Sequence, residues 1–397
     1  MLTLFQFKPS LKKFAQALMA HAQHNSFAHP MHFDADRARI LTGANGDQIV
    51  NLANLYKQYR DAARADRPRV LEMCMAILRD TSLPQRFEEV RAKLLPAVRA
   101  RSYAESVRLS ARLAGTALPG TSVAALGDDV VTVIAVDDAD SMSIVTAAQL
   151  DAWGVSFDEA LDAALDNLRA IPGGGFARGP DGVMIGDWND AYDSSRLLLP
   201  DLVHRAGIGD PVAMIPTRDG ILLAPAGDRR ALLAMLALAS TASQEQGRTV
   251  SAAMYHFRNS SAEPYVPDDE EVARGLAQLR QRYLADDYAD QKTLLDDLHD
   301  KHDIDLFVAS FVLVQDNHAR QEFSLCTWSE GVDALLPKSD RIALVRFNEQ
   351  GEAQRAGMYD WDTVSAVAGH LMTPEPDTYP IRYRVRQFPD LTLLKVH

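Results

Sequence analysis

The chain of 397 residues has little cysteine and no long apolar run. Its only cysteines, Cys74 and Cys326, lie far apart in the sequence. They exclude a disulfide framework and a cysteine-based zinc site, and they favour a reducing compartment. No run approaches the ~18 apolar residues of a membrane-spanning helix, and the first residues lack the basic-then-apolar order of a signal peptide. We therefore expect a cytoplasmic protein with no membrane partner.

Familiar catalytic and cofactor-binding spacings are also missing. The sequence has no G-x-S-x-G or H-E-x-x-H motif, and no G-x-G-x-x-G opens a helix after a strand. Gly173, Gly174 and Gly175 follow a predicted helix and lack the lysine of a phosphate-binding loop. His299 and His302 are surrounded by aspartates, but their spacing matches no catalytic metal motif. We predict no cofactor, no metal site and no assigned catalytic residue.

Charge is distributed unevenly around a formal net charge of −13. Residues 1–110 hold 17 of the 41 basic and 10 of the 54 acidic residues, whereas residues 268–305 hold 12 acidic and 5 basic ones. An acidic protein repels nucleic acid at long range. The basic stretch from Lys57 to Arg69 is a local exception, but Tyr56 and Tyr59 beside it have the spacing of core residues. Nucleic acid is not favoured, and a protein partner or a small anionic ligand is the better expectation.

Hydrophobic periodicity predicts an α+β protein with several domains and mixed sheets. The continuous apolar run Val130–Val136 indicates a strand covered on both faces, and Ile144–Thr146 its partner. Ser156 and Glu159 form a capping box before a helix, and Asp228 caps a helix that is apolar nearly all round. Because helices and hairpins separate the strands irregularly, we favour mixed sheets over a doubly wound parallel sheet.

Three domains are predicted along the chain. Residues 1–80 form a small α+β domain, residues 81–265 a central α+β domain and residues 266–397 a C-terminal α+β domain. In the last of these, Val272–Tyr283 indicates an amphipathic helix, and Leu306–Val314 and Ile342–Phe347 indicate buried strands.

The last predicted strand carries a row of arginines. Arg382, Arg384 and Arg386 alternate with apolar residues, which places the three on one face roughly 6.5–7 Å apart. Such a row repels itself unless it meets an acidic surface, which the segment 268–305 or a partner protein provides, or an anionic ligand. We treat the three as interaction candidates. The alternative is an exposed edge strand whose charges discourage aggregation.

The densest polar cluster lies between Asp187 and Arg196, at the start of a short apolar helical run. Asp190 and Asp193 could bind a cation or act as general acid and base, with Arg196 holding an anionic group. In the structural interpretation, Asp193 caps a helix that starts at Ser194, and Arg196 pairs with one of the aspartates. The candidate ligand-binding residues are Asp187, Asp190, Tyr192, Asp193, Arg196 and Arg218.

Several short motifs in one order give the chain a family resemblance. They are N-L-Y-x-x-Y from Asn54, I-V-T from Ile144, L-D-A-W-G-V-S from Leu150, Y-D-S-S-R-L-L from Tyr192 and P-T-R-D from Pro216. Over roughly residues 40–245 the chain resembles the YtpQ-like bacterial proteins. The family has no established activity, so the resemblance implies a bacterial cytoplasmic protein and no mechanism. The C-terminal third, from about residue 268, lies outside it.

Missing catalytic spacings, segregated charge and an added C-terminal part favour a non-catalytic interaction or ligand-binding module. A hydrolase or metal-dependent enzyme with a site at Asp187–Arg196 is the alternative. The sequence leaves open whether the protein is an enzyme.

Overall fold

The computed structural model describes residues 8–27, 31–35, 39–42, 48–78, 84–115, 123–138, 141–246, 249–258, 261–316, 321–348 and 350–394. The chain is α+β, as predicted. The described residues form five sheets, of which two in the C-terminal part mix parallel and antiparallel pairs.

The N-terminal part packs three helices with a small antiparallel sheet. Its elements are α1 (Leu11–His24), β1 (His32–Asp34), β2 (Arg39–Thr42), β3 (Gln48–Asn51), α2 (Ala53–Asp61) and α3 (Arg67–Leu78). The Phe14 ring lies 6.2 Å from that of Tyr56 and 4.9 Å from that of Tyr59. Both tyrosines of the basic stretch therefore pack against the core, as their spacing indicates.

The first central sheet is built around one fully buried strand. Its elements and the helices around it are α4 (Phe87–Val90), β4 (Leu94–Ala100), α5 (Arg101–Ala114), β5 (Ala124–Leu126), β6 (Val130–Asp138), β7 (Ser141–Ile144), α6 (Ala147–Trp153) and α7 (Phe157–Ala170). Strand β6 pairs with β4, β5 and β7, and no residue from Val130 to Val136 is more than 4% exposed. The Ser156 hydroxyl accepts a hydrogen bond from the Glu159 N–H at 3.2 Å and caps α7. Both sequence predictions are confirmed.

A second, six-stranded sheet completes the central part in the order β13-β12-β10-β11-β9-β8. Its elements are β8 (Phe176–Arg178), β9 (Met184–Gly186), α8 (Pro200–His204), β10 (Pro211–Met214), β11 (Leu222–Pro225), α9 (Arg229–Gln246), β12 (Met254–Arg258) and β13 (Ser261–Tyr265). Asp228 caps α9 by accepting from the Ala231 N–H at 3.1 Å. Helix α9 buries Met235 and Ala239 completely in the core of this sheet, as its apolar sequence predicts.

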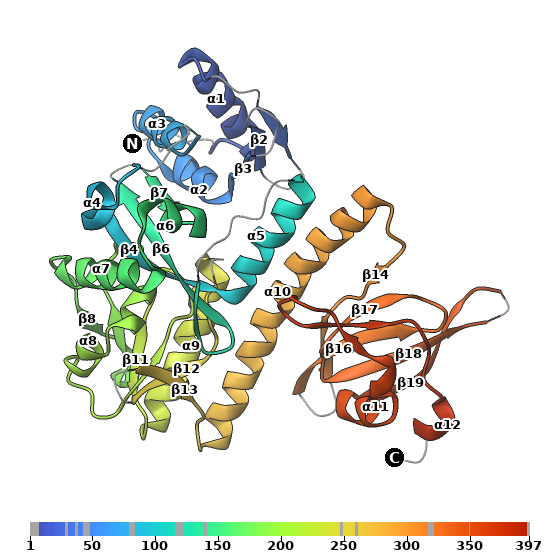
Figure 1. The fold of residues 1–397 in the computed structure, drawn as a ribbon. Helices are drawn as coiled ribbons and strands as arrows, with labels where there is room; N and C mark the ends of the chain where they lie inside the picture. Colours follow the sequence, from blue (N-terminus) through green and yellow to red (C-terminus); the bar gives the residue numbers. More distant parts are fainter. Residues whose placement is uncertain are drawn as a thin grey trace, which may run out of the picture.

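One long helix joins the central and C-terminal parts. Helix α10 (Glu270–His302) has 33 residues, which gives a length of about 50 Å. It runs diagonally between the two parts and beside α5 (Figure 1). Val272, Leu276 and Leu279 pack into the core of α9, whereas Leu295 and Leu298 pack against C-terminal residues. The predicted helix over Val272–Tyr283 is therefore the first part of a connector that belongs to both cores.

The C-terminal part folds two four-stranded sheets around its own core. Its elements are β14 (Phe307–Val308), β15 (Val312–Asp316), β16 (Gln321–Ser329), β17 (Ala334–Pro337), β18 (Arg341–Phe347), β19 (Ala353–Asp360), α11 (Trp361–Ala368), β20 (Thr373–Pro374), β21 (Arg382–Val385) and α12 (Leu391–Leu394). Trp328, Ile342 and Leu344 are completely buried there. Strand β18 confirms the strand predicted at Ile342–Phe347, although Phe347 at its end is 49% exposed.

The buried strand predicted at Leu306–Val314 is wrong. Phe307–Val308 pairs with β17 in one sheet, and Val312–Asp316 pairs with β16 in the other. Phe307 and Val312 are 51% and 49% exposed. The apolar run is a crossing from sheet to sheet, which periodicity alone does not distinguish from a strand buried on both faces. The two boundaries between the three predicted domains stay predictions.

Candidate functional site

A cavity of about 590 Å³ lies where the central part, α10 and the C-terminal part meet. Asp129 and Tyr255 line it from the two central sheets, Arg280 and Asp287 from α10, and Tyr379 from the C-terminal part. Its volume falls within the roughly 300–1,000 Å³ of small-molecule sites, which prefer domain interfaces. The cavity is therefore the main candidate for a functional site.

Hydrogen bonds fix the wall on the central side. The Asp129 carboxylate accepts from the Ser251 hydroxyl at 2.6 Å and from the Tyr255 hydroxyl at 3.0 Å. Ser251 Oγ also accepts from the Ala253 N–H at 2.9 Å. Ser251 and Tyr255 are 1% and 0% exposed. Because Ser251 is covered and fully hydrogen-bonded, it is a wall residue rather than a nucleophile.

The opposite wall carries a carboxyl group with a perturbed pKa. Burial raises the pKa of Asp287 to about 6; the Ser102 hydroxyl lowers it in part, and the carboxylates of Asp290, Asp286 and Asp129 raise it further. The charges that act most strongly on Asp287 are thus all negative. A perturbed carboxyl group in a cavity indicates a functional site more often than one on an open surface.

The sequence analysis missed this cavity. Its lining comes from segments around residues 128, 250, 280, 338 and 379, which no local spacing connects. The one signal in the sequence is on α10, where Arg280, Leu284 and Asp287 share a helix face at i, i+4 and i+7. That pattern is common on solvated helices and does not identify a site.

The structure brings together only part of the predicted cluster at Asp187–Arg196. Arg196 donates two hydrogen bonds to the Asp190 carboxylate, at 2.9 and 2.6 Å. Asn189 and Ala191 have φ of 56° and 65°, so the loop turns back sharply and brings Asp190 to Arg196. Burial raises the pKa of Asp190, but the bonds from Arg196 and the Tyr192 N–H outweigh it and leave that pKa below its usual value.

Trp188 closes this ion pair from one side. Its ring centre lies 4.2 Å from the Arg196 guanidinium carbon, and Phe176 packs edge-on against it at 5.1 Å. The indole rests on Gly174, where an added Cβ would lie 2.1 Å from the ring. Arg196 is 1% exposed, so its charge is balanced by Asp190 inside the protein.

Asp193 lies close enough to the pair for the charges of Asp190 and Arg196 to act on its pKa, which burial raises. The predicted cap at Asp193 is wrong, because Ser194–Leu198 is a 3₁₀ turn without a side-chain cap and the Asp193 carboxylate accepts from the Trp188 N–H at 3.1 Å instead. Asp187 is exposed and accepts from Asn189 at 2.6 Å.

Two further candidates point elsewhere. Burial, with the charge of Asp137, raises the pKa of the Tyr192 hydroxyl. The Arg218 guanidinium lies over the Tyr103 ring at 5.4 Å, and the Arg218 carbonyl accepts from the Ser194 N–H at 3.4 Å. None of the six residues lines the 590 Å³ cavity.

The alternative of an exposed edge strand is wrong for Arg382. Strand β21 lies between β17 and β20, not at an edge, and α10 covers its first residue. Arg382 is 0% exposed and donates to Gln291 Oε1 at 2.6 Å, to the Ala309 carbonyl at 2.8 Å and to the Tyr288 carbonyl at 3.1 Å. Burial lowers the pKa of Arg382 to about 10.

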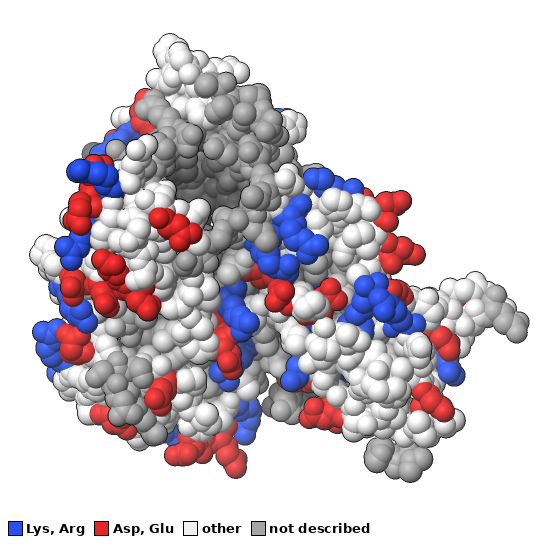
Figure 2. Space-filling model, in the orientation of Figure 1, with Lys and Arg blue, Asp and Glu red and all other residues white. Residues whose placement is uncertain are grey.

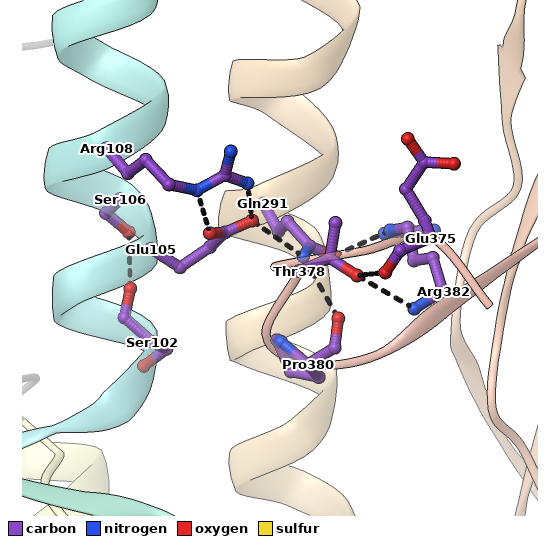
Figure 3. A network of polar contacts seen from close by, with 9 residues as sticks. All are labelled: Ser102, Glu105, Ser106, Arg108, Gln291, Glu375, Thr378, Pro380 and Arg382. Atoms are coloured by element: carbon purple, nitrogen blue, oxygen red, sulfur yellow. Dashed lines mark hydrogen bonds and ion pairs between the residues drawn. The ribbon is translucent and has the colours of Figure 1, made fainter. Parts of the chain in front are cut away.

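Gln291 links this arginine to a carboxylate on α5. Its amide nitrogen donates to Glu105 at 3.3 Å and to the Pro380 carbonyl at 3.0 Å, and Glu105 is held by Arg108 at 2.8 and 2.9 Å (Figure 3). The network thus crosses from α5 through α10 to β21. It fixes the C-terminal part against the helix pair.

The other two arginines of the row follow the prediction more closely. The Arg384 and Arg386 side chains are 31% and 67% exposed, and both contact Asp333, at 2.9 and 3.5 Å. Both also line a second cavity of about 350 Å³. Their acidic neighbour is thus Asp333, not the segment 268–305.

Metal and membrane sites were examined over the described residues. There, no group of three or more His, Cys, Asp or Glu side chains could hold a metal ion, and none of the described helices is long and apolar enough to cross a membrane. His299 is 8% exposed and its Nδ1 lies 3.0 Å from the Leu306 carbonyl oxygen. Cys74 and Cys326 are both free, and burial raises the pKa of each thiol to about 12.

Acidic and basic side chains alternate over the face drawn in Figure 2. No continuous field of one sign covers that face. The uneven charge along the sequence is therefore mixed in space on this side, which leaves local cavities as the better guide to function. Comparison of the chain with protein-family models, with curated proteins and with solved structures gives no match.

Proposed function

We propose that the protein is a non-catalytic binding module of the cytoplasm that holds a small ligand in the 590 Å³ cavity. The observation that carries this proposal is the place of the cavity, between two separate cores and the helix that joins them. A ligand there contacts both parts at once, so its binding free energy stabilises one relative arrangement of them. The expected protein partner stays a prediction.

The alternative enzyme at Asp187–Arg196 has less support. Arg196 is committed to Asp190 and Trp188, and neither of the two cavities is lined by a residue of that cluster. Ser195 is 1% exposed and its hydroxyl accepts from the Val98 N–H at 3.1 Å, which ties the 3₁₀ turn to β4. These bonds give the cluster a structural role.

Filling the cavity tests the proposal. Leu284 lines it and is half-buried, so Leu284→Trp should occupy part of its volume. Leu393 is 55% exposed and far from the cavity in sequence, and Leu393→Trp serves as the matched control. Ligand-observed NMR with a library of small amines, carboxylates and amino acids should show compounds that bind the natural protein and the control, and lose binding to Leu284→Trp. Equal binding to both variants, or no binding to the natural protein, would contradict a ligand site here.

A further inference from the structure

The cavity presents positive charge from two directions. Arg280 on α10 and Lys338 after β17 both line it, and both are exposed. Within the described part of the chain, neither side chain makes an ion pair, whereas many other basic side chains do. A carboxylate of a ligand would receive charge-assisted hydrogen bonds from them.

Negative charge lies two helical turns away on the same wall. Asp287 follows Arg280 by seven residues, which is roughly 10 Å along the helix axis. Asp287 is half-buried, and the nearest strong charges around it are carboxylates. An ammonium group at this end would relieve that repulsion and hold the Asp287 carboxyl ionised.

The wall between the two charges is apolar. Leu284 lies between Arg280 and Asp287 on the same helix face, and Val250, Ala252 and Pro264 line the cavity as well. The α10 face of the cavity therefore runs from cation through apolar surface to carboxyl group. Asp129 and Asp340 line other sides, where both carboxylates already accept hydrogen bonds within the protein. A ligand that matches this order has an anionic end, an apolar middle and a cationic end.

Building on the function proposed above, we infer that the ligand is a small zwitterion whose two charges are separated, a short peptide with apolar side chains. Its carboxylate binds toward Arg280 and Lys338, and its ammonium group toward Asp287. An anion alone would leave the Asp287 end without a partner, and an amine alone would leave the two cations without one.

Isothermal titration at pH 7.5 tests this inference with L-leucine, L-leucyl-L-leucine and two derivatives of the dipeptide. N-acetylation removes the ammonium charge, and C-terminal amidation removes the carboxylate charge. We expect the dipeptide to bind, and each blocked dipeptide to bind about tenfold more weakly or worse. Leucine should also bind more weakly than the dipeptide, because its two charges share one carbon atom.

Variants assign each charge to its end of the cavity. Arg280→Gln should weaken the zwitterion but not the C-terminal amide, and Asp287→Asn should weaken the zwitterion but not the N-acetyl derivative. Arg274→Gln and Asp300→Asn are matched controls, because both residues are exposed on α10 and neither lines the cavity.

Two results would overturn the inference while the cavity remains a ligand site by the NMR test. One is equal affinity for the zwitterion and a blocked derivative, which would indicate a simple anion or amine site. The other is no binding of the dipeptide by a protein whose cavity still binds library compounds. Loss of all library binding would instead contradict the proposed function itself.

Discussion

Arg196 in the central part and Arg382 in the C-terminal part are 1% and 0% exposed, yet their charges are balanced differently. Arg196 meets the carboxylate of Asp190, six residues before it, in a two-bond ion pair. Arg382 donates only to neutral oxygens, and its link to a carboxylate passes through Gln291 to Glu105. A buried guanidinium can thus be hydrogen-bonded by a residue close to it in the sequence, or by groups that only the fold brings together.

The same comparison explains why the surroundings of Arg196 were predicted from the sequence better than those of Arg382. A pairing of Arg196 with Asp190 was one of the alternatives that the spacing allowed, and it is what the structure shows. For Arg382 the strand alternation indicated a face shared with Arg384 and Arg386, and it left open whether that face meets an acidic surface, an anionic ligand or solvent. A strand alternates correctly, but whether one face of it meets solvent or another helix is decided by what packs there.

Replacing Arg382 should have the largest effect. Arg382→Met removes four hydrogen bonds to buried oxygens and loosens the contact between β21 and α10, so the free energy of unfolding should fall by about 3–5 kcal/mol. Urea denaturation measures it. Arg386→Met is the control and should change it by less than about 0.5 kcal/mol, because that side chain is 67% exposed. Equal effects of the two changes would show that Arg382 is not a structural centre.

Breaking the ion pair between Asp190 and Arg196 should have the second-largest effect. Asp190→Asn leaves the Arg196 charge without a carboxylate, and the free energy of unfolding should fall by about 2–4 kcal/mol, less than for Arg382 because the Asp190 side chain is 23% exposed. The control is Asp201→Asn, which breaks a surface pair with Arg205 and should cost less than about 0.5 kcal/mol. If the Asp190 variant is no less stable than the control, direct pairing contributes little here.

The contribution of Glu105, which reaches Arg382 through Gln291, can be measured separately. Glu105→Gln should lower the free energy of unfolding by about 1–2 kcal/mol, since it weakens the bond to Gln291 and removes the pair with Arg108. Arg108→Gln removes that pair but keeps the carboxylate, so it should cost less. Equal losses in the two variants would mean that Arg382 is stabilised by neutral groups alone.

The smallest effect is expected at the exposed end of the arginine row. Asp333→Asn should lower the free energy of unfolding by about 0.5–1 kcal/mol, because its partners Arg384 and Arg386 are 31% and 67% exposed. Salt screens exposed pairs, so the difference in melting temperature between this variant and the natural protein should shrink in 1 M NaCl. The Arg382→Met effect should persist in the same salt. If the effect of Asp333→Asn does not depend on salt, Asp333 and its two arginines behave like a buried ion pair, and the expectation is wrong.

Elements with strong local signals were predicted well. Strand β6, the Ser156 and Asp228 caps, the buried helix α9 and strand β18 all follow from residues close together in the sequence. The run Leu306–Val314 failed because an apolar segment that crosses between two sheets has the same composition as a buried strand. The Asp193 cap failed because a nearer donor, the Trp188 N–H, was brought to it by the folded loop.

The candidate site was not predictable in the same way. The segment Asp187–Arg196 was predicted as a site because its polar residues are adjacent in the sequence. In the fold these residues mostly bond to one another. The cavity draws its polar groups from five segments, and none of those segments carries an unusual pattern alone.

The sequence by itself determined the α+β class and the elements with strong local signals, because hydrogen bonding, capping and apolar periodicity act over a few residues. Tertiary structure decided the rest: the burial of Arg382, the sheet crossing after Leu306 and the cavity beside Asp287. Each of these depends on how α10 packs between two cores, and packing brings together residues that are far apart in the chain, where no local free energy specifies their contact.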